Sequence, residues 1–208
     1  NKTGNYNTAI GYRAFFNGTN FSNSTAIGYD AYIDTSNQIR IGNASVNSIG
    51  GHVAWTALSD MRFKKDVKEN VPGLDFIMKL KPVTYYLDMD AIAQFNNTPD
   101  SLRLKDAEAL KGKMLQTGFI AQDVEKAASE CGFEFSGVDA PQNENGYYGL
   151  RYATFVVPLV KAVQEQQQTI NDLQQKVEEQ QKTIETLLIQ NQEIIKQNQE
   201  ITKKLNEN

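Results

Sequence analysis

The C-terminal part of the chain carries an uninterrupted heptad pattern, with core positions at steps of three and four from Leu159 to Leu205. Such a pattern keeps one stripe of a helix facing its partner when the helices wind around each other in a left-handed sense. No glycine or proline follows Pro158, so nothing in the sequence breaks the helix. The pattern therefore predicts a coiled coil over 158–208. Its two core positions hold Val163, Ile170, Val177, Ile184, Asn191, Asn198 and Leu205 in one set, and Leu159, Gln166, Leu173, Gln180, Leu187, Ile194 and Ile201 in the other.

The polar residues in this seam indicate how many helices meet. Gln166, Gln180, Asn191 and Asn198 lie at core positions, where buried amides lower stability but fix register and strand number. β-Branched residues at one core position with leucine at the other favour a dimer. Repeated buried amides, together with the N-terminal repeats described next, favour a coiled coil of three helices. We predict a homotrimer, in which the partner is the same chain.

The N-terminal part of the chain contains a short repeat. The sequence Thr-Ala-Ile-Gly-Tyr at 8–12 returns at 25–29, and a weaker Ile-Arg-Ile-Gly copy follows at 39–42. The glycines of successive copies are 17 and then 14 residues apart. Each copy is too short to bury a core of its own, so the copies must stack on one another to be stable. The alternation of side chains predicts one short strand in each copy, with the glycines at the corners.

This repeat resembles the Ala-Ile-Gly repeats in the heads of trimeric autotransporter adhesins. The resemblance implies a left-handed parallel β-roll built by three chains, which we expect over residues 1–56. The alternative is an irregular linker, because asparagine, glycine and serine are frequent here. The pattern is already under way at Asn1, so we expect more β-rich sequence of the same polypeptide upstream.

Residues 57–157 have the mixed pattern of a compact α+β domain. We expect a short helix after Pro72 that places Leu74, Ile77 and Met78 on one side, and then a strand at 82–87. The polar sequence that follows predicts a helical insert with loops over 88–113.

The second half of this domain predicts one helix and two strands. The run at 117–121 leads into a helix that Gly132 closes. Aromatic and β-branched residues predict two more strands at 133–138 and 147–152. The sequence Pro-Gln-Asn-Glu-Asn-Gly at 141–146 predicts the turn between them.

The junction between the repeats and the α+β domain carries the motif Ser-Asp-Met-Arg-Phe-Lys-Lys at 59–65. This motif resembles the Ser-Asp-x-Arg-x-Lys signature that opens the intramolecular chaperone domain of the S74 peptidase family. Further matches are Gly-Phe-Ile-Ala-Gln-Asp-Val at 118–124 and Gly-Leu-Arg-Tyr at 149–152, which runs on into the heptads. Such domains lie at the C-terminus of phage tail spikes and tail fibres, of which endosialidases are the familiar case.

The resemblance implies a domain that trimerises, guides the folding of a β-rich stalk upstream and then cuts itself off just before the serine. Carried over position by position, Ser59 matches the nucleophile, Lys64 the base, and Leu58-Ser59 the scissile bond. The implied enzyme is a self-cleaving serine endopeptidase that acts on its own chain. The candidates for a supporting role are Asp60, Arg62 and Lys65.

A Ser–Lys dyad places two physical demands on this motif. A serine hydroxyl becomes a good nucleophile when a neighbour takes its proton, and a lysine does so only as the neutral amine. Free lysine has a pKa near about 10.4, so Lys64 must be desolvated or crowded by cations, for which Arg62 and Lys65 are available. Residues five apart lie about 140 degrees apart on a helix and on opposite faces of a strand. The dyad must therefore close around a bend or across a subunit interface, with Asp60 most simply a cap.

Charge and composition exclude several classes of partner. A net charge of -4 provides no global positive field for nucleic acid. No apolar run approaches the roughly 18 residues that span a bilayer, so we expect no membrane insertion. Cys131 and His52 each occur once, which excludes an internal disulfide framework and a cysteine-based zinc site. We expect no cofactor and no metal.

Two other functions fit parts of the sequence. One is a non-cleaving structural trimerisation module of a phage tail fibre or bacterial surface adhesin, because serine and aspartate at 59–60 are also common cap residues. The other is a glycan-binding fibre tip, although the sequence has no clear cluster of aromatic and polar residues. From the family resemblance we expect a virion tail fibre, or a bacterial surface or prophage-encoded protein. The expected fold is an elongated homotrimer with three successive regions, at 1–56, 57–157 and 158–208.

Overall fold

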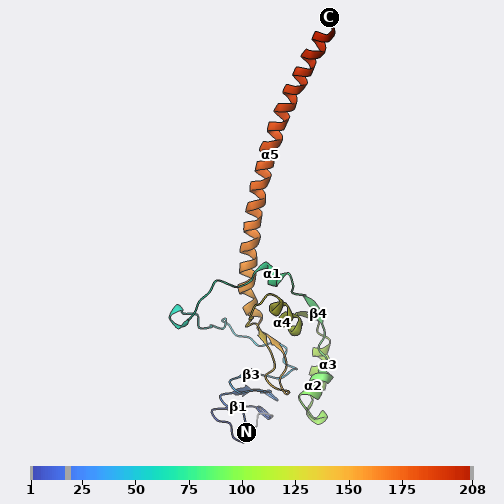
Figure 1. Cartoon of the computed structure of the whole chain (residues 1–208). Coiled ribbons are helices and arrows are strands. Elements are labelled where there is room, and N and C mark those ends of the chain that lie inside the picture. The colour runs from blue at the N-terminus through green and yellow to red at the C-terminus, as the bar shows by residue number, and fades with distance from the viewer. Residues whose placement is uncertain (1, 17–19, 207–208) are drawn as a thin grey trace. The chain divides into compact units, whose positions relative to one another are not determined.

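The structure is a computed structural model that describes residues 2–16 and 20–206 (Figure 1). The chain divides into two compact units. The first contains the chain up to Asn70 together with Met78–Val156, and the second contains Val71–Ile77 and the chain from Val157 onward. Mixed α and β structure followed by a long C-terminal helix confirms that part of the predicted fold class.

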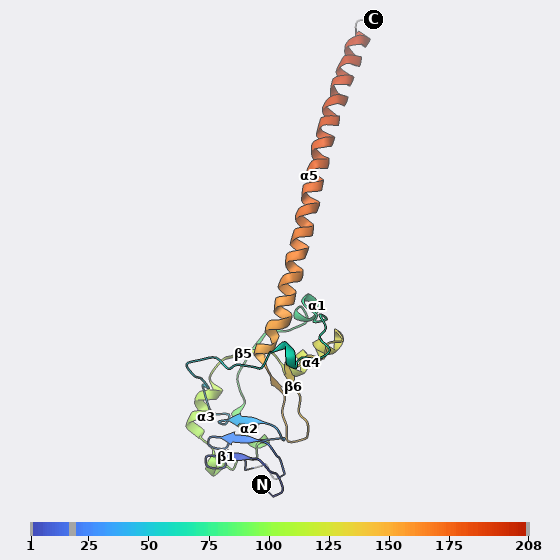
Figure 2. The same cartoon turned by 90° about the vertical axis from the view of Figure 1, so that its left-hand side faces the viewer.

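The three repeat copies form a parallel three-stranded sheet in the order β1 (Thr8–Ile10), β2 (Thr25–Ile27), β3 (Ile39–Ile41), as Figure 2 shows. Equivalent residues pair directly, since Ala9 lies opposite Ala26 and Ile10 opposite Ile27. The predicted strand in each copy is confirmed, and the copies lie one above another.

Side chains one copy apart form ladders along this stack. The Nε of Arg13 donates to the Oδ1 of Asp30 at 3.0 Å, and the Nδ2 of Asn23 donates to the Oδ1 of Asn37 at 2.8 Å. The core of the stack consists of small and apolar side chains that are almost fully buried, namely Phe15, Ala26, Ala31 and Ile33. The isoleucines at 10, 27, 39 and 41 are exposed instead, so one face of the sheet is apolar and uncovered in the single chain.

The corner glycines are required by the stacking itself. Gly11 and Gly28 have φ of 122° and 112°, values that side chains rarely adopt. A Cβ on Gly11 would also lie 2.6 Å from the carbonyl oxygen of Gly28. Successive turns therefore approach as closely as they do only because no side chain stands between them.

The α+β part of the first unit contains a two-stranded antiparallel sheet with a helical insert between its strands. The strands are β4 (Val83–Tyr85) and β5 (Gln116–Gly118). The insert over 88–113 contains α2 (Met89–Phe95), the 3-10 helix η2 (Asp100–Leu102) and α3 (Lys105–Gly112). The predicted strand at 82–87 and the predicted helical insert are both confirmed.

Helix α4 (Ala121–Glu130) ends as predicted at Gly132, whose φ is 61°. The N–H of Gly132 bonds to the carbonyl of Ser129, and the N–H of Phe133 bonds to that of Ala128, which is the Schellman arrangement. The predicted strand at 133–138 is wrong, because Phe133 completes the helix end and the strand β6 is confined to Val138–Asp139.

The last strand of this unit is also shorter than predicted. β7 (Gly149–Leu150) pairs antiparallel with β6 around the predicted turn. The 3-10 helix η3 (Tyr152–Phe155) follows directly. Tyr152 is therefore not part of a strand, because its hydroxyl accepts the backbone N–H of Phe119 at 3.1 Å and its ring stacks on that of Phe155.

The second unit consists of the short helix α1 (Leu74–Ile77) and the long helix α5 (Val156–Asn206). Gly73 lies so close to α5 that a Cβ would be 2.7 Å from the nitrogen of Ala162, and the N–H of Leu74 donates to Glu165 at 2.8 Å. The buried side chain of α1 is Phe76, whereas Met78 lies beyond the helix and is exposed, so the predicted apolar side was wrong at Met78.

Helix α5 contains the whole heptad pattern without a break (Figure 1). The apolar residues at the heptad core positions are exposed in the single chain; Leu173, for example, is 54% exposed. Helices in proteins gain most of their stability from packing an apolar stripe.

Candidate functional site

The predicted dyad lies in a long exposed segment that follows the repeats. Within residues 47–70, all of which the structure describes, the 3-10 helix η1 (Met61–Phe63) is the one helical turn. Its apolar side chains face solvent, since Leu58 is 79% and Met61 82% exposed. In the single chain this segment therefore has no core of its own.

The η1 turn is formed by hydrogen bonds close to the predicted cleavage site. The N–H of Phe63 bonds to the carbonyl of Asp60, and that of Lys64 bonds to the carbonyl of Met61, both at 3.1 Å. Asp60 is the N-cap, because its Oδ1 accepts the N–H of Arg62 at 2.9 Å. This geometry supplies a bend between the two residues of the predicted dyad.

The bend brings the predicted nucleophile and base together. The Nζ of Lys64 lies 3.0 Å from the Oγ of Ser59, which is hydrogen-bond distance. Both side chains are exposed. The arrangement can pass a proton from the hydroxyl to a neutral amine, which is the geometric requirement for activating a serine.

Asp60 and Arg62 form a bidentate ion pair beside the dyad. The Nε of Arg62 lies 3.0 Å and the Nη2 2.6 Å from Asp60 Oδ2. The side-chain hydrogen bond from Arg62, followed by the one from its backbone N–H, lowers the pKa of Asp60. The positive charge of Arg62 is thus directed to Asp60, and Lys65, the other predicted cation, is exposed.

The described residues contain neither a cluster of metal-binding side chains nor a membrane-spanning helix. Across 2–16 and 20–206 there is no group of three histidine, cysteine, aspartate or glutamate side chains able to hold a metal ion. The helices in that same part of the chain include none that is long and apolar enough to cross a bilayer.

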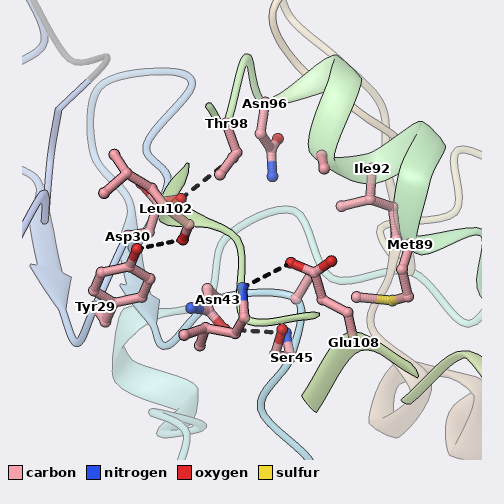
Figure 3. A pocket seen from close by; sticks show the side chains of 13 residues that line it. Tyr29, Asp30, Asn43, Ser45, Met89, Ile92, Asn96, Thr98, Leu102 and Glu108 are labelled. Carbon is pink, nitrogen blue, oxygen red and sulfur yellow. Dashed lines mark hydrogen bonds between the residues drawn. The ribbon is translucent and has the colours of Figure 1, made fainter. Parts of the chain in front are cut away.

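A second structural feature is the contact between the helical insert and the repeats. We call residues 88–113 the helical arm. The hydroxyl of Tyr29 donates to the carbonyl of Leu102, and the hydroxyl of Thr98 donates to Asp30 (Figure 3). These residues line a cavity of about 30 Å³, which leaves room for about one or two waters.

The helical arm is held together by Arg103, which pairs with one exposed and one almost fully buried carboxylate. The guanidinium of Arg103 contacts Asp90 on α2 and Glu108 on α3, each at 2.6 Å. Glu108 is almost fully buried and also accepts the N–H of Leu104. Because a buried carboxylate is stable only when paired, Arg103 fixes the two helices of the arm relative to each other.

A second arm holds the repeats at another corner. We call residues 138–150, which contain β6, β7 and their turn, the hairpin arm. The Nδ2 of Asn143 donates to the carbonyl of Asp34 at 2.8 Å. The hydroxyl of Tyr32 donates to the carbonyl of Asn145 at 3.2 Å, and Arg40 lies over the ring of Tyr147.

Sequence reasoning missed both arm contacts. The insert was recognised as helical, and the turn at 141–146 was recognised as a turn. Nothing in the sequence indicates that residues 73 positions apart, such as Tyr29 and Leu102, meet. The only signal was that polar, turn-forming residues occur in both places.

The fold and the site thus define a chain in which a serine–lysine pair lies between a stack of β-repeats and an α+β domain that contacts those repeats. Residues 59–133 match the Peptidase S74 family, described as the chaperone of endosialidase. The match confirms, for this part of the chain, the family resemblance seen in the sequence. It begins at Ser59 and includes the motif at 118–124, while the motif at 149–152 lies beyond it. No curated protein and no solved structure matches the chain.

The family match points to a chaperone role. The S74 family is one of peptidases and chaperones, and some of its members cleave themselves.

Proposed function

We propose that this chain is an intramolecular chaperone that assembles as a homotrimer, assists the folding of the β-rich sequence upstream, and then releases itself by cutting between Leu58 and Ser59. The observation that carries the proposal is the 3.0 Å distance between Lys64 Nζ and Ser59 Oγ, at the first residue of the family match. The S74 resemblance supplies the reaction, and the bend at η1 supplies the geometry.

The chemistry needs only groups of the chain and water. The Oγ of Ser59 forms a bond to the carbonyl carbon of Leu58 while the neutral amine of Lys64 takes the hydroxyl proton. The carbon–nitrogen bond of the peptide then breaks, and the proton passes from Lys64 to the released nitrogen. Water hydrolyses the resulting ester, which leaves a carboxylate on Leu58 and restores the hydroxyl of Ser59.

Assembly would make the amine neutral. In the single chain Ser59 and Lys64 are exposed, and a lysine in water is almost entirely protonated at neutral pH. Leu58, Met61 and Phe63, which are close to the pair in the sequence, have exposed apolar side chains. Copies of the chain that bury these side chains would also remove water from the amine, which favours its neutral form. Cleavage would then follow assembly.

The uncovered apolar surfaces support assembly from copies of the same chain. The seam of α5 and the isoleucine face of the repeat sheet are both exposed. Burying an aliphatic side chain contributes roughly 1.5–3 kcal/mol, so two such surfaces on one chain favour association strongly. Three copies agree with the polar layers of the seam and with a β-roll formed by the repeats.

The two arms support the chaperone role. They contact the second repeat copy at Tyr29, Asp30, Tyr32 and Asp34, and the third copy at Arg40. These bonds involve backbone groups and corner side chains, so they form only when the turns have their stacked geometry. The arms would therefore stabilise a folded turn over an unfolded one. From the family resemblance, the setting would be a virion tail fibre, or a bacterial surface or prophage-encoded protein.

A gel experiment tests the proposal. The wild-type chain, Ser59→Ala and the control Thr56→Ala, which removes another exposed hydroxyl of the same segment, are incubated and compared in denaturing and native gels. We expect wild type and Thr56→Ala to yield residues 1–58 and a fragment beginning at Ser59, while Ser59→Ala stays intact as a trimer. A wild-type chain that remains one band while forming a trimer would leave the alternative, a non-cleaving trimerisation module.

A further inference from the structure

We propose that Asp60 is a positioning residue for self-cleavage, because its carboxylate caps the turn that holds Lys64 against Ser59. This inference rests on the proposed function and adds a residue to it. Asp60 does not touch the scissile bond in this role. It acts through the backbone of η1.

The turn is what makes the dyad possible. Five residues of extended chain span about 16 Å, yet the side chains of Ser59 and Lys64 meet at 3.0 Å across such a separation. The change of direction occurs within η1, between the N-cap Asp60 and the C-cap Lys64. If the turn opens, the two groups separate.

Little else in the single chain holds this turn. None of its residues is buried, so it has no packing to stabilise it. Its two backbone hydrogen bonds are both 3.1 Å long, and short 3-10 turns have poor hydrogen-bond geometry. The bond from the N–H of Arg62 to Asp60 Oδ1, at 2.9 Å, is therefore a large share of what closes the bend.

The cap and the ion pair of Asp60 are separable. The carboxylate accepts the Arg62 N–H and also pairs with the Arg62 guanidinium. The Arg62 side chain is 80% exposed, and exposed ion pairs contribute little. An N-cap acceptor contributes more. The cap is thus the interaction that positions Lys64, and asparagine, which keeps the acceptor oxygen, should replace aspartate.

The experiment follows cleavage of the full chain in cell-free pulse-chase synthesis, with the rate of appearance of the fragment beginning at Ser59 as readout. Asp60→Ala should be slower by about tenfold, since loss of an N-cap is of that size. Asp60→Asn should restore the rate to within about threefold of wild type, and Arg62→Gln should behave like Asp60→Asn. Glu69→Ala, which removes another exposed carboxylate of this segment, is the matched control and should cleave like wild type.

Assembly and melting temperature are measured on the same variants in a Ser59→Ala background. A positioning role leaves both unchanged, whereas a general structural role lowers both. The inference is overturned if Asp60→Ala cleaves like wild type, or if Asp60→Asn is as slow as Asp60→Ala. A wild-type chain that stays as intact as Ser59→Ala instead overturns the proposed cleavage itself.

Discussion

Lys64 Nζ lies within hydrogen-bond distance of Ser59 Oγ, at 3.0 Å, although neither side chain is shielded from solvent in the single chain. The orientation of the dyad is therefore set locally, by the turn within residues 59–64. What the single chain lacks is the removal of water from the amine. On the proposed function, folding of the segment and activation of the dyad are two separate steps, and the second depends on other copies of the chain.

Lys64→Arg tests whether the amine acts as a base. Arginine keeps the positive charge but stays protonated at any accessible pH, so it cannot take the serine proton. Loss of a general base lowers rates by about 10²–10⁴-fold, and we expect a decrease of that size in the pulse-chase assay. Lys65→Arg is the matched control and should cleave at the wild-type rate. Equal cleavage rates for Lys64→Arg and wild type would show that a group other than Lys64 is the base.

Charged residues in the heptad seam should block assembly and cleavage together. Ile170 and Leu173 lie at core positions, so Ile170→Asp with Leu173→Asp would bury unpaired charges in a trimer. We expect a monomer by sedimentation and no fragments on gels. Thr186 lies outside the predicted seam, one turn after Lys182. The control variant Thr186→Asp should therefore assemble normally. A monomer that cuts itself at the wild-type rate would contradict cleavage that depends on assembly.

Gly11→Ala should disrupt the repeat stack. The backbone of Gly11 has a φ that alanine adopts only under strain, and the new methyl would meet Gly28. Strained conformations of this kind destabilise by roughly 1–3 kcal/mol, before any clash is counted. Gly50→Ala is the control, because its Cβ would meet no atom within 4 Å. Urea unfolding of both variants, in a Ser59→Ala background, measures the difference.

Tyr29→Phe should weaken the contact between the helical arm and the repeats. The variant removes one hydrogen bond and leaves the carbonyl of Leu102 without that donor, which costs about 0.5–1.5 kcal/mol. We expect lower stability in urea and a lower yield of refolded trimer, both in the Ser59→Ala background. Tyr86→Phe, on a ring that is 61% exposed, should change neither. Equal refolding yields for the two variants would show that this contact does not assist folding.

The η1 turn should be sensitive to acid. The pKa of Asp60 is lowered, first by the side-chain hydrogen bond from Arg62 and then by its backbone N–H. A carboxyl with a lowered folded pKa stabilises the folded turn above its unfolded pKa, near about 3.9, and this contribution is lost as the pH falls through the lower folded value. A protonated carboxyl keeps an acceptor oxygen for the Arg62 N–H but loses the ion pair, so the turn should be less stable in acid than at neutral pH. Titration of the Asp60 carboxyl carbon by NMR checks this, and Arg62→Gln should move that pKa back towards its ordinary value.

Several features of the fold could be predicted because they are periodic. Copies of Thr-Ala-Ile predict equivalent strands, and β1 pairs with β2 residue for residue. The heptads predict one unbroken helix, and α5 runs from Val156 to Asn206. In both cases each residue has the same environment as the equivalent residue of the repeat before it. The pattern alone therefore predicts the secondary structure.

The predictions failed where a local preference met a specific tertiary contact. Phe133 and Phe135 favour a strand by composition. In the structure the N–H of Phe133 closes α4, and the ring of Phe135 lies edge-on to that of Phe155 at 4.8 Å. Aromatic packing and a helix end together outweigh β-propensity.

The dyad shows what a motif leaves out. The identities of Ser59 and Lys64 came from the family resemblance, and their separation required a bend. Capping by Asp60 was expected from the sequence and is confirmed, but the 3-10 turn that it caps follows from φ and ψ values that a single sequence does not specify. The pairing of Arg62 with Asp60 was likewise missed, since Arg62 had been expected to crowd Lys64.

The arm contacts described above fall on residues 29–40, at the second and third repeat copies. Every turn of the stack presents its successor with the same backbone edge, so a stalk can gain or lose whole turns while the last ones keep their shape. The number of turns in the stalk is therefore independent of the helical arm and the hairpin arm, which contact only the last turns. On the proposed function, duplication of a turn would lengthen the stalk while the residues of the two arms stay the same, and a different stalk that ended in the same two turns could be joined to them.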